Sequence, residues 1–313
     1  MKMISERNYN KHIYNTITDL IFNANDNYQV RLQSDNECVL PEHVRKVLSE
    51  IAEKYDYDMK KKYLINMEFI SEWQKSVIGH VDVESAIIAT EYIIFCCVAD
   101  KMLDSKRFSD EFKRNLLKYA IIDSFISDIT LTNEEKELEC VFDLVTDIRS
   151  FLNRYSGRKK NDLMCEIEKA LASERFMSTH DLKYDISKKD VHFLIDKSVS
   201  FESSALKISL LPFNTNSDLQ AYLIGEVFWL IDDICDLLDD YKNGRINSLL
   251  YYNNNADQIT DRLVYAVEHI DYSISQLKEK VDLLKKHSNV TMHEFLKEQI
   301  WWWLSDARRL CGL

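Results

Sequence analysis

The sequence predicts an all-α protein, and its residue usage and periodicity carry that prediction. The 313 residues include only 5 glycines and 2 prolines, so few positions are suited to tight turns. Long helices tolerate this scarcity, whereas a protein with many strands needs more turn residues. Apolar residues recur with helical spacing from Pro41 onward. We therefore expect a loosely ordered N-terminal arm over residues 1–40 and a single helical domain over residues 41–313.

Helical patterns follow one another along the rest of the chain. The breaks between them contain suitable residues, such as Ser156-Gly157 and Asn243-Gly244. No internal repeat and no Gly/Ser-rich linker interrupts the series, which favours one domain. The expected helices span residues 42–54, 59–76, 82–104, 109–129, 133–153, 160–173, 188–210, 217–242, 256–285 and 292–310.

The charge and composition exclude several classes of function. A net charge of −12 argues against a nucleic-acid partner. The most apolar stretch, residues 86–103, contains Glu91, Asp100 and Lys101 and is too polar for a membrane span. The 7 cysteines lack metal-ligand or secretory spacing, and the chain starts without an apolar signal segment. We expect a cytoplasmic protein with no nucleic-acid partner and no integral membrane span.

An acidic run at the end of the helix expected over residues 217–242 says most about function. On helical spacing Asp232, Asp236 and Asp240 share one face, and Asp233 lies beside them. Like charges at this spacing destabilise a helix by roughly 0.2–0.5 kcal/mol per pair. Carboxylates beside packed apolar residues need a compensating cation, and oxygen ligands without His or Cys favour Mg²⁺. The alternative is a solvated acidic helix face.

A second acidic pair and one lysine extend this pattern. Asp100 and Asp104 are spaced i, i+4 at the end of a heavily apolar helix, and Lys197 lies in another mostly apolar helix. Two acidic helix ends that face each other would clamp a polyphosphate through metals. A diphosphate oxygen would also satisfy the ammonium of Lys197. The simpler alternatives are that Asp100 pairs with Lys101 or Lys106 and that Lys197 pairs with Asp196 or lies at the surface.

The acidic run resembles motifs of the class I isoprenoid synthase superfamily. Residues 225–236 follow the pattern Gly-x-x-Phe-x-x-x-Asp-Asp-x-x-Asp, which resembles the second aspartate-rich motif of trans-prenyl diphosphate synthases. Asp232, Asp236 and Asp240 also occupy positions similar to the three metal ligands of class I terpene cyclases. Residues 236–245 resemble the second motif of squalene and phytoene synthases.

Two upstream segments are similar to other parts of these enzymes. Lys197-Ser198 is similar to the Lys-Thr diphosphate-binding segment of prenyl diphosphate synthases. Asp100 and Asp104 are similar to the outer members of their first aspartate-rich motif, with Lys101 in place of the second aspartate. The resemblance covers residues 86–247 and implies an antiparallel helical bundle around a central apolar cavity.

The resemblance also implies the composition of the active site. It implies two or three Mg²⁺ ions and a prenyl diphosphate substrate, and it leaves a homodimer open. The implied metal ligands are Asp100, Asp104, Asp232, Asp233, Asp236 and Asp240, with Asp233 as ligand or support. The residues implied to stabilise the leaving diphosphate are Lys197, Lys242 and Arg245, and those implied to contact the hydrocarbon are Phe228 and Trp229.

Departures from the elongating synthases favour cyclisation. The chain has no early Gly-Gly-Lys-x-x-Arg-Pro segment, and Trp229 replaces the glutamine of their second motif. An indole at a cavity suits carbocations through cation–π contact. The run Trp301-Trp302-Trp303 would add aromatic walls or lie in a helix that is buried on several sides.

We therefore predict a Mg²⁺-dependent class I terpene synthase that ionises a linear prenyl diphosphate and then cyclises or quenches the cation. The alternatives are a condensing prenyltransferase, of the elongating or the squalene/phytoene-like type, and a degenerate protein that binds a prenyl diphosphate without catalysis. The small residues Cys96, Cys97 and Gly225 precede the acidic motifs and would leave a deep cavity, which favours a C15–C20 substrate.

Overall fold

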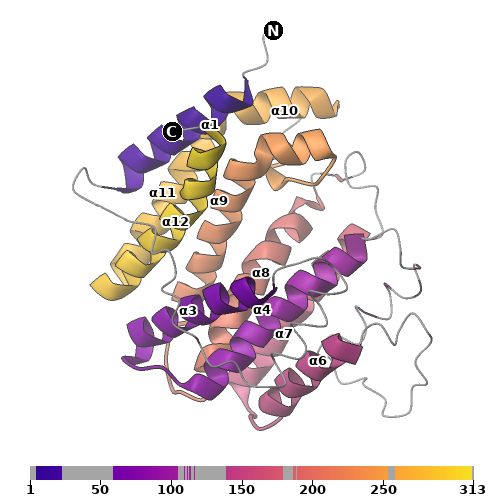
Figure 1. Cartoon of the computed structure of the whole chain (residues 1–313), viewed down its shortest axis with the longest axis vertical. Coiled ribbons are helices and arrows are strands. Elements are labelled where there is room, and N and C mark those ends of the chain that lie inside the picture. Colours follow the sequence, from indigo (N-terminus) through magenta and orange to yellow (C-terminus); the bar gives the residue numbers. More distant parts are fainter. Residues whose placement is uncertain are drawn as a thin grey trace. The chain divides into compact units, whose positions relative to one another are not determined.

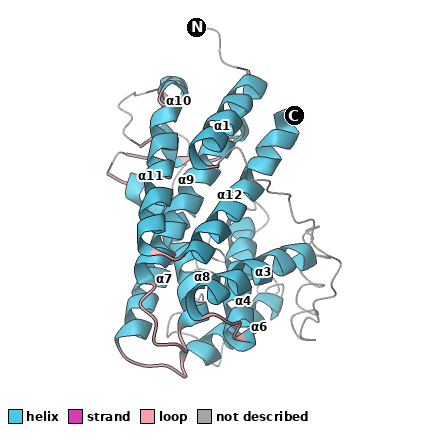
Figure 2. Ribbon diagram, turned by 90° about the vertical axis from the view of Figure 1, so that its left-hand side faces the viewer, coloured by secondary structure: helices cyan, strands magenta, loops and turns pink. Residues whose placement is uncertain are grey.

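The computed structural model describes residues 5–22, 59–104, 139–178, 186–187, 189–252 and 258–311, together with positions 109, 111, 113 and 116. Over these residues the chain forms helices joined by loops, with no strand (Figure 2). The all-α prediction is therefore confirmed. The helices are α1 (Glu6–Ile21), α3 (Met59–Ile78), α4 (Val83–Asp104), α6 (Glu139–Leu152), α7 (Arg158–Ser178), α8 (Val191–Leu210), α9 (Asp218–Asn243), the short 3₁₀ helix η2 (Ser248–Leu250), α10 (Ile259–Glu268), α11 (Ile270–His287) and α12 (Val290–Cys311).

The chain divides into two compact units. Unit 1 comprises Met1–Ser34, Thr179–Val199 and Tyr222–Leu313, and unit 2 comprises Asp35–Ser178 and Ser200–Ala221. Unit 1 therefore holds α1, most of α9, η2 and α10 to α12, and unit 2 holds α3, α4, α6 and α7. The predicted domain division, an arm to residue 40 and one domain from residue 41, stays a prediction.

A helix lies within the N-terminal arm that the sequence predicted to be loosely ordered. Residues 6–21 form α1, which begins at the cap Ser5, whose hydroxyl accepts a hydrogen bond from the backbone N–H of Asn8. Tyr9, Ile13 and Ile17 recur every four residues and form its buried face. In unit 1 this helix packs against α11 and α12 (Figure 1). The prediction of a loosely ordered arm gave more weight to the Asn-rich composition of this region than to its apolar stripe.

Unit 2 is organised around α4, which packs against α3, α6 and α7. Its core contains a buried polar network: the amide of Gln74 donates to the hydroxyl of Ser85 at 2.9 Å and to the carbonyl of Ser209 at 2.8 Å. The indole of the fully buried Trp73 donates to the carbonyl of Leu206 at 3.1 Å. These bonds tie α3, α4 and the second half of α8 together, because a buried polar group without a partner costs about 1–3 kcal/mol.

Some predicted helix bounds agree with the structure, and others do not. The helices expected over residues 82–104 and 217–242 correspond to α4 and α9 within about one residue. The single helix expected over residues 256–285 is wrong, because α10 and α11 are separated at His269, whose φ of −109° and ψ of 16° leave the helical region. The helices expected over residues 42–54 and 109–129 lie wholly or largely outside the described residues.

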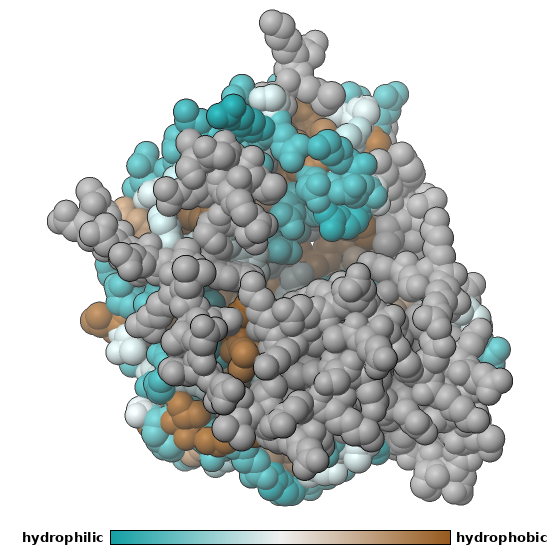
Figure 3. All heavy atoms as spheres, viewed as in Figure 1, coloured by the Kyte–Doolittle hydropathy of each residue, from teal (hydrophilic) through white to brown (hydrophobic). Residues whose placement is uncertain are grey.

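No helix in the described parts of the chain combines the length and the apolarity that crossing a membrane requires. On the face in Figure 3, hydrophilic side chains make up most of the described surface, with smaller hydrophobic patches between them.

Candidate active site

The acidic run lies on the second half of α9, on the side away from its apolar stripe. The fully buried side chains Ile224, Val227, Ile231, Ile234 and Leu237 line one side of this helix. Asp232 and Asp236 are exposed, whereas Asp240 is half-buried. The helix therefore has one face for packing and one face that carries a row of carboxylates, as its periodicity predicted.

The carboxylates of the row raise one another's proton affinity. Partial desolvation, followed by the negative charges of Asp232 and Asp240, raises the pKa of Asp236 to about 6. Desolvation also raises the pKa of Asp240, while the hydrogen bond from Asn247 and the charge of Arg245 lower it. The row is thus a site of concentrated negative charge that a bound cation would stabilise.

Asp233 has a different environment from the rest of the run. Its Oδ2 accepts a hydrogen bond from the indole N–H of Trp229 at 2.9 Å and one from the backbone N–H of Ser248 at 3.1 Å. The hydroxyl of Ser248 donates to the same oxygen, and the indole also donates to that hydroxyl at 2.8 Å. Burial is the main cause that raises the pKa of Asp233 to about 7, and the bonds from Ser248 oppose it.

The segment after α9 folds back onto the carboxylates. Gly244 has a φ of +70°, a conformation that glycine adopts easily, and it ends the helix. Arg245 forms an ion pair with Asp240 at 2.9 Å and also pairs with Asp239. The buried amide of Asn247 donates to Asp240 at 3.1 Å and to the backbone carbonyl of Asp233 at 2.8 Å.

The sequence analysis missed Asn247 and Ser248 as parts of the site. Both are buried, and both contact the acidic run through hydrogen bonds. The available signal was their position: two residues with side-chain hydrogen-bonding groups directly follow the Gly244-Arg245 turn.

Two tryptophans of the run near the C-terminus contact different parts of unit 1. The indole of Trp303 donates to Asp232 at 3.2 Å, and its ring lies 4.9 Å from that of Phe228. Trp301 instead contacts α1, with its ring 6.1 Å from Tyr14. The side chain of Trp302 lies outside the described residues. Of the described pair, only Trp303 therefore contacts the acidic run.

Gly225 allows α9 to pack closely against α8 and does not deepen a substrate cavity. A Cβ atom at this position would lie 2.6 Å from the carbonyl oxygen of Val199 and 3.2 Å from its Cα. The backbone of α8 fills the space that a side chain would take, so the prediction that Gly225 leaves depth for a substrate is wrong. Cys96 and Cys97 are half-buried on α4, and their role stays a prediction.

The cations and aromatic residues predicted for the site have different surroundings. Lys242 is exposed and forms an ion pair with Glu6 of α1 at 2.6 Å. Lys197 is half-buried on α8. Phe228 and Trp229 are both buried, and the ring of Trp229 lies 6.0 Å from that of Tyr252. Their contacts with a diphosphate or a hydrocarbon stay predictions.

The first acidic pair belongs to unit 2. Asp100 is half-buried in the last turns of α4, which ends at Asp104. The side chain of Asp104 lies outside the described residues. The predicted position of this pair opposite the α9 row stays a prediction.

Among the residues that the structure describes, no group of three or more His, Cys, Asp or Glu side chains is already arranged to hold a metal ion. In unit 1, three of the four predicted α9 ligands are engaged by other protein groups: Asp232 by Trp303, Asp233 by Trp229 and Ser248, and Asp240 by Arg245 and Asn247. The chemistry of the donors nevertheless fits Mg²⁺, since all are carboxylate oxygens.

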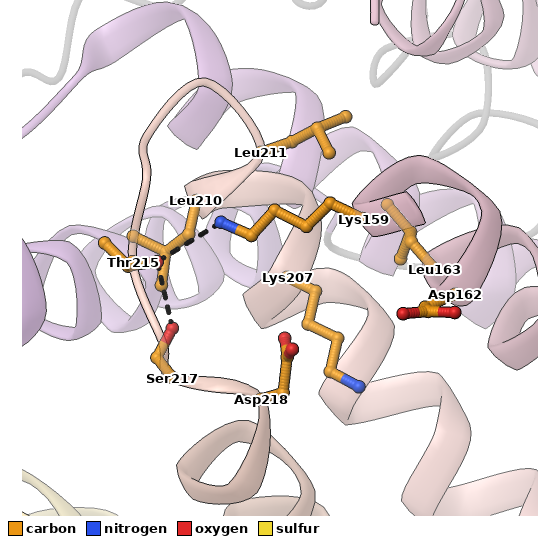
Figure 4. Close-up of a pocket in the computed structure, with 9 residues that line it drawn as sticks. All are labelled: Lys159, Asp162, Leu163, Lys207, Leu210, Leu211, Thr215, Ser217 and Asp218. Carbon is orange, nitrogen blue, oxygen red and sulfur yellow. Dashed lines mark hydrogen bonds between the residues drawn. The ribbon is translucent and has the colours of Figure 1, made fainter. Parts of the chain in front are cut away.

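A cavity of about 240 Å³ in unit 2 has mixed charge (Figure 4). Lys159 reaches across it and donates to the carbonyl of Phe213 at 2.6 Å, while Thr215 and Ser217 lie 3.2 Å apart through their hydroxyls. Lys207, which also lines it, pairs with Glu166. None of the residues predicted for the active site lines this cavity.

No known protein-family model matches the chain, and no curated protein matches it in sequence. Among solved structures, the chain is similar to 2-methylisoborneol synthase from Streptomyces coelicolor A3(2) in complex with Mg²⁺ and geranyl-S-thiolodiphosphate. The two share 13% sequence identity with a TM-score of 0.51, over 85% of this chain and 90% of that chain.

Two further structures of the same synthase have TM-scores below 0.5. One matches with 13% identity and a TM-score of 0.48, over 85% of this chain and 88% of that chain. The other, in complex with Mg²⁺ and 2-fluoroneryl diphosphate, matches with 11% identity and a TM-score of 0.49, over 86% of this chain and 90% of that chain.

The first of these similarities shows that the chain has the all-α fold of class I terpene synthases. The resemblance that the acidic motifs indicated is thus confirmed at the level of the fold.

Proposed function

We propose that this protein is a class I terpene synthase that ionises a linear prenyl diphosphate of 15 to 20 carbons and cyclises or quenches the resulting cation. One observation carries the proposal: Asp232, Asp236 and Asp240 lie as a row on the polar side of α9, at helical spacing, and Phe228 and Trp303 lie beside it. Neighbouring negative charges are unfavourable without a cation, and aromatic rings suit a carbocation.

The carboxylate row would hold two or three Mg²⁺ ions, together with Asp100 and Asp104. When bound, Mg²⁺ neutralises charge that develops on the departing diphosphate. Arg245 already contacts Asp240 and is placed to add positive charge beside the same row. Lys197 and Lys242 are proposed to act in the same way.

The reaction begins when the bond between the allylic carbon and the diphosphate oxygen breaks and the electron pair leaves with the oxygen. An internal double bond attacks the cation and closes a ring, or the cation is quenched without closure. In either case the cation ends by losing a proton to give a hydrocarbon, or by adding water and losing a proton from it to give an alcohol. The faces of aromatic rings at the site would stabilise the positive charge while it moves along the chain. Phe228 and Trp229 are proposed to have this role.

The test is incubation of the purified protein with Mg²⁺ and prenyl diphosphates of 10, 15 or 20 carbons, with and without isopentenyl diphosphate. Released diphosphate is measured by an enzyme-coupled assay, and organic products are measured by gas chromatography with mass spectrometry. We expect a hydrocarbon or alcohol from a single substrate of 15 or 20 carbons. Asp236→Asn serves as the matched variant that keeps the shape of the side chain and removes its charge.

The other outcomes separate the alternatives. A longer diphosphate formed only with isopentenyl diphosphate would identify an elongating prenyltransferase, and a product that joins two substrates head to head would identify the squalene-like type. Binding of a prenyl diphosphate without diphosphate release, in the presence of Mg²⁺, would contradict the proposal and leave a non-catalytic binding protein.

A further inference from the structure

Asp233 differs from its neighbours in what it contacts. Three donor groups converge on one of its oxygens: the indole N–H of Trp229, the backbone N–H of Ser248 and the hydroxyl of Ser248. An oxygen that accepts from three protein donors has no lone pair left for a metal ion, so these contacts remove one of the two carboxylate oxygens of Asp233 from metal binding. The contacts instead connect α9 to the segment that follows it.

That segment in turn contacts the carboxylate row. Asn247 donates both to the backbone carbonyl of Asp233 at 2.8 Å and to the carboxylate of Asp240 at 3.1 Å. Two residues earlier, Arg245 forms an ion pair with Asp240 at 2.9 Å. A displacement of the segment from α9 would therefore release Asp240 from two partners together.

Packing and hydrogen bonds both hold the end of the segment. Asn247 and Ser248 are buried, and beyond them Leu249 and Tyr252 line a cavity of about 340 Å³. The hydrogen bonds to Asp233 add a directed connection to α9 that packing alone does not give.

We infer that Asp233 is a positioning residue that clamps the segment Gly244–Ser248 against α9 and thereby orients Asp240 and Arg245, and that it is not a metal ligand. The consequence for catalysis rests on the proposed function, whereas the clamp itself does not. Asp233 acts by accepting hydrogen bonds, and the oxygen of an amide can accept the same bonds. A metal ligand in the row acts through its negative charge.

This distinction gives a direct test with three variants. Asp233→Asn keeps an acceptor oxygen, Asp233→Leu keeps a side chain branched at Cγ without an acceptor, and Asp236→Asn removes a charge from the row. Hydrogen exchange of the peptide that covers residues 246–252 reports the clamp. Isothermal titration of Mg²⁺ in the presence of inorganic diphosphate reports the metal site.

We expect Asp233→Leu to speed exchange in residues 246–252 by at least about tenfold, because the amide of Ser248 loses its acceptor. Asp233→Asn should change that exchange by less than about threefold and weaken Mg²⁺ binding far less than Asp236→Asn does. Asp236→Asn should leave the exchange of this segment unchanged.

If Asp233→Leu does not fold, Ser248→Ala removes the hydroxyl from the same clamp, with Ser275→Ala as the matched control. The hydroxyl of Ser275 bonds only to the backbone of its own exposed helix turn among the contacts described. Faster exchange of residues 246–252 in the first variant and not in the second supports the clamp.

Two results would overturn the inference: unchanged exchange in both Asp233→Leu and Ser248→Ala, or a loss of Mg²⁺ binding in Asp233→Asn as large as that in Asp236→Asn. If the unmodified protein binds no Mg²⁺ with diphosphate, the proposed function fails, and the exchange measurements still decide whether the clamp exists.

Discussion

An acid on α9 and an acid on α4 illustrate two uses of a carboxyl group. Asp233 on α9 receives hydrogen bonds from Trp229 and Ser248, and those from Ser248 oppose the rise of its pKa that desolvation causes. Glu91 on α4 is fully buried, and desolvation, followed by the charge of Asp147, raises its pKa to about 8.

Desolvation and a neighbouring carboxylate raise the pKa of both groups, and only Asp233 also has hydrogen bonds from Ser248 that oppose the rise. Directed donors make a buried carboxylate a structural anchor, because each bond stabilises the ionised form. A second carboxylate makes the ionised form less stable, so the group keeps its proton. The row of Asp232, Asp236 and Asp240, of which the first two are exposed and the third is half-buried, combines mutual repulsion with access to solvent, which suits a cation site.

The largest effect that we predict tests this interpretation of the row. Asp236→Asn should lower turnover by on the order of 10²–10⁴-fold, since the loss of a ligand removes several kcal/mol of charge stabilisation. The free energy of unfolding should fall little or rise, because repulsion from Asp232 and Asp240 disappears. Steady-state kinetics and urea denaturation measure the two quantities. Unchanged turnover would remove Asp236 from the site.

A second prediction concerns how α9 is held in place beside its acidic face. Gly225→Ala should lower the free energy of unfolding by about 1–3 kcal/mol, because the new Cβ would lie 2.6 Å from the carbonyl oxygen of Val199. Urea denaturation measures this change. Leu219→Ala, at an exposed position of the same helix, is the control and should have a smaller effect. A stabilised Gly225→Ala protein would contradict the close approach.

The sequence predicted those parts of the fold for which it carries a local signal, such as apolar periodicity or a helix terminator. The bounds of α4 and α9 were predictable because apolar periodicity and local terminators coincide there, as at Gly244. The break at His269 was not, since neither glycine nor proline marks it. Helix α1 was missed although Ser5 and the stripe from Tyr9 to Ile17 were visible in the sequence.

Within the site, spacing predicted the row of carboxylates but not their individual partners. The bonds from Ser248 to Asp233 depend on the path of the backbone after Gly244, which local periodicity does not determine. The contact between Trp303 and Asp232 joins residues 71 positions apart. Such long-range pairs follow from tertiary packing, so a single sequence gives no direct signal for them.

A third prediction concerns Glu91 and tests the contrast between this acid and Asp233. Below its ordinary pKa of about 4.5, Glu91 is protonated in both the folded and the unfolded chain. As the pH rises towards about 8, the unfolded chain releases this proton while the folded protein retains it, so the folded state loses stability. Glu91→Gln removes this titration. We expect it to raise the free energy of unfolding by ~1–2 kcal/mol at pH 8, with little gain near pH 5.

Urea denaturation at pH 5, 6.5 and 8 follows the effect, with Glu84→Gln as the control. Glu84 lies on the same helix, is largely exposed and pairs with Arg154 at 2.9 Å. Its substitution should change stability little at any of these pH values, because exposed ion pairs contribute about 0–1 kcal/mol. An equal gain from Glu91→Gln at all three values would show that Glu91 does not titrate in this range.

The smallest predicted effect concerns Trp303, which links α12 to the row. Trp303→Phe keeps a ring against Phe228 but removes the N–H that donates to Asp232 at 3.2 Å. Asp232 is exposed, so water can replace the lost donor and the net contribution of the bond is about 0.5–1.5 kcal/mol; the Mg²⁺ concentration for half-maximal activity should therefore rise by about 2–10-fold. Trp301→Phe is the matched control, since Trp301 contacts Tyr14 of α1 instead. Equal Mg²⁺ dependence in the two variants would show that the indole does not orient Asp232, and the row would then owe its geometry to α9 and the segment after it alone.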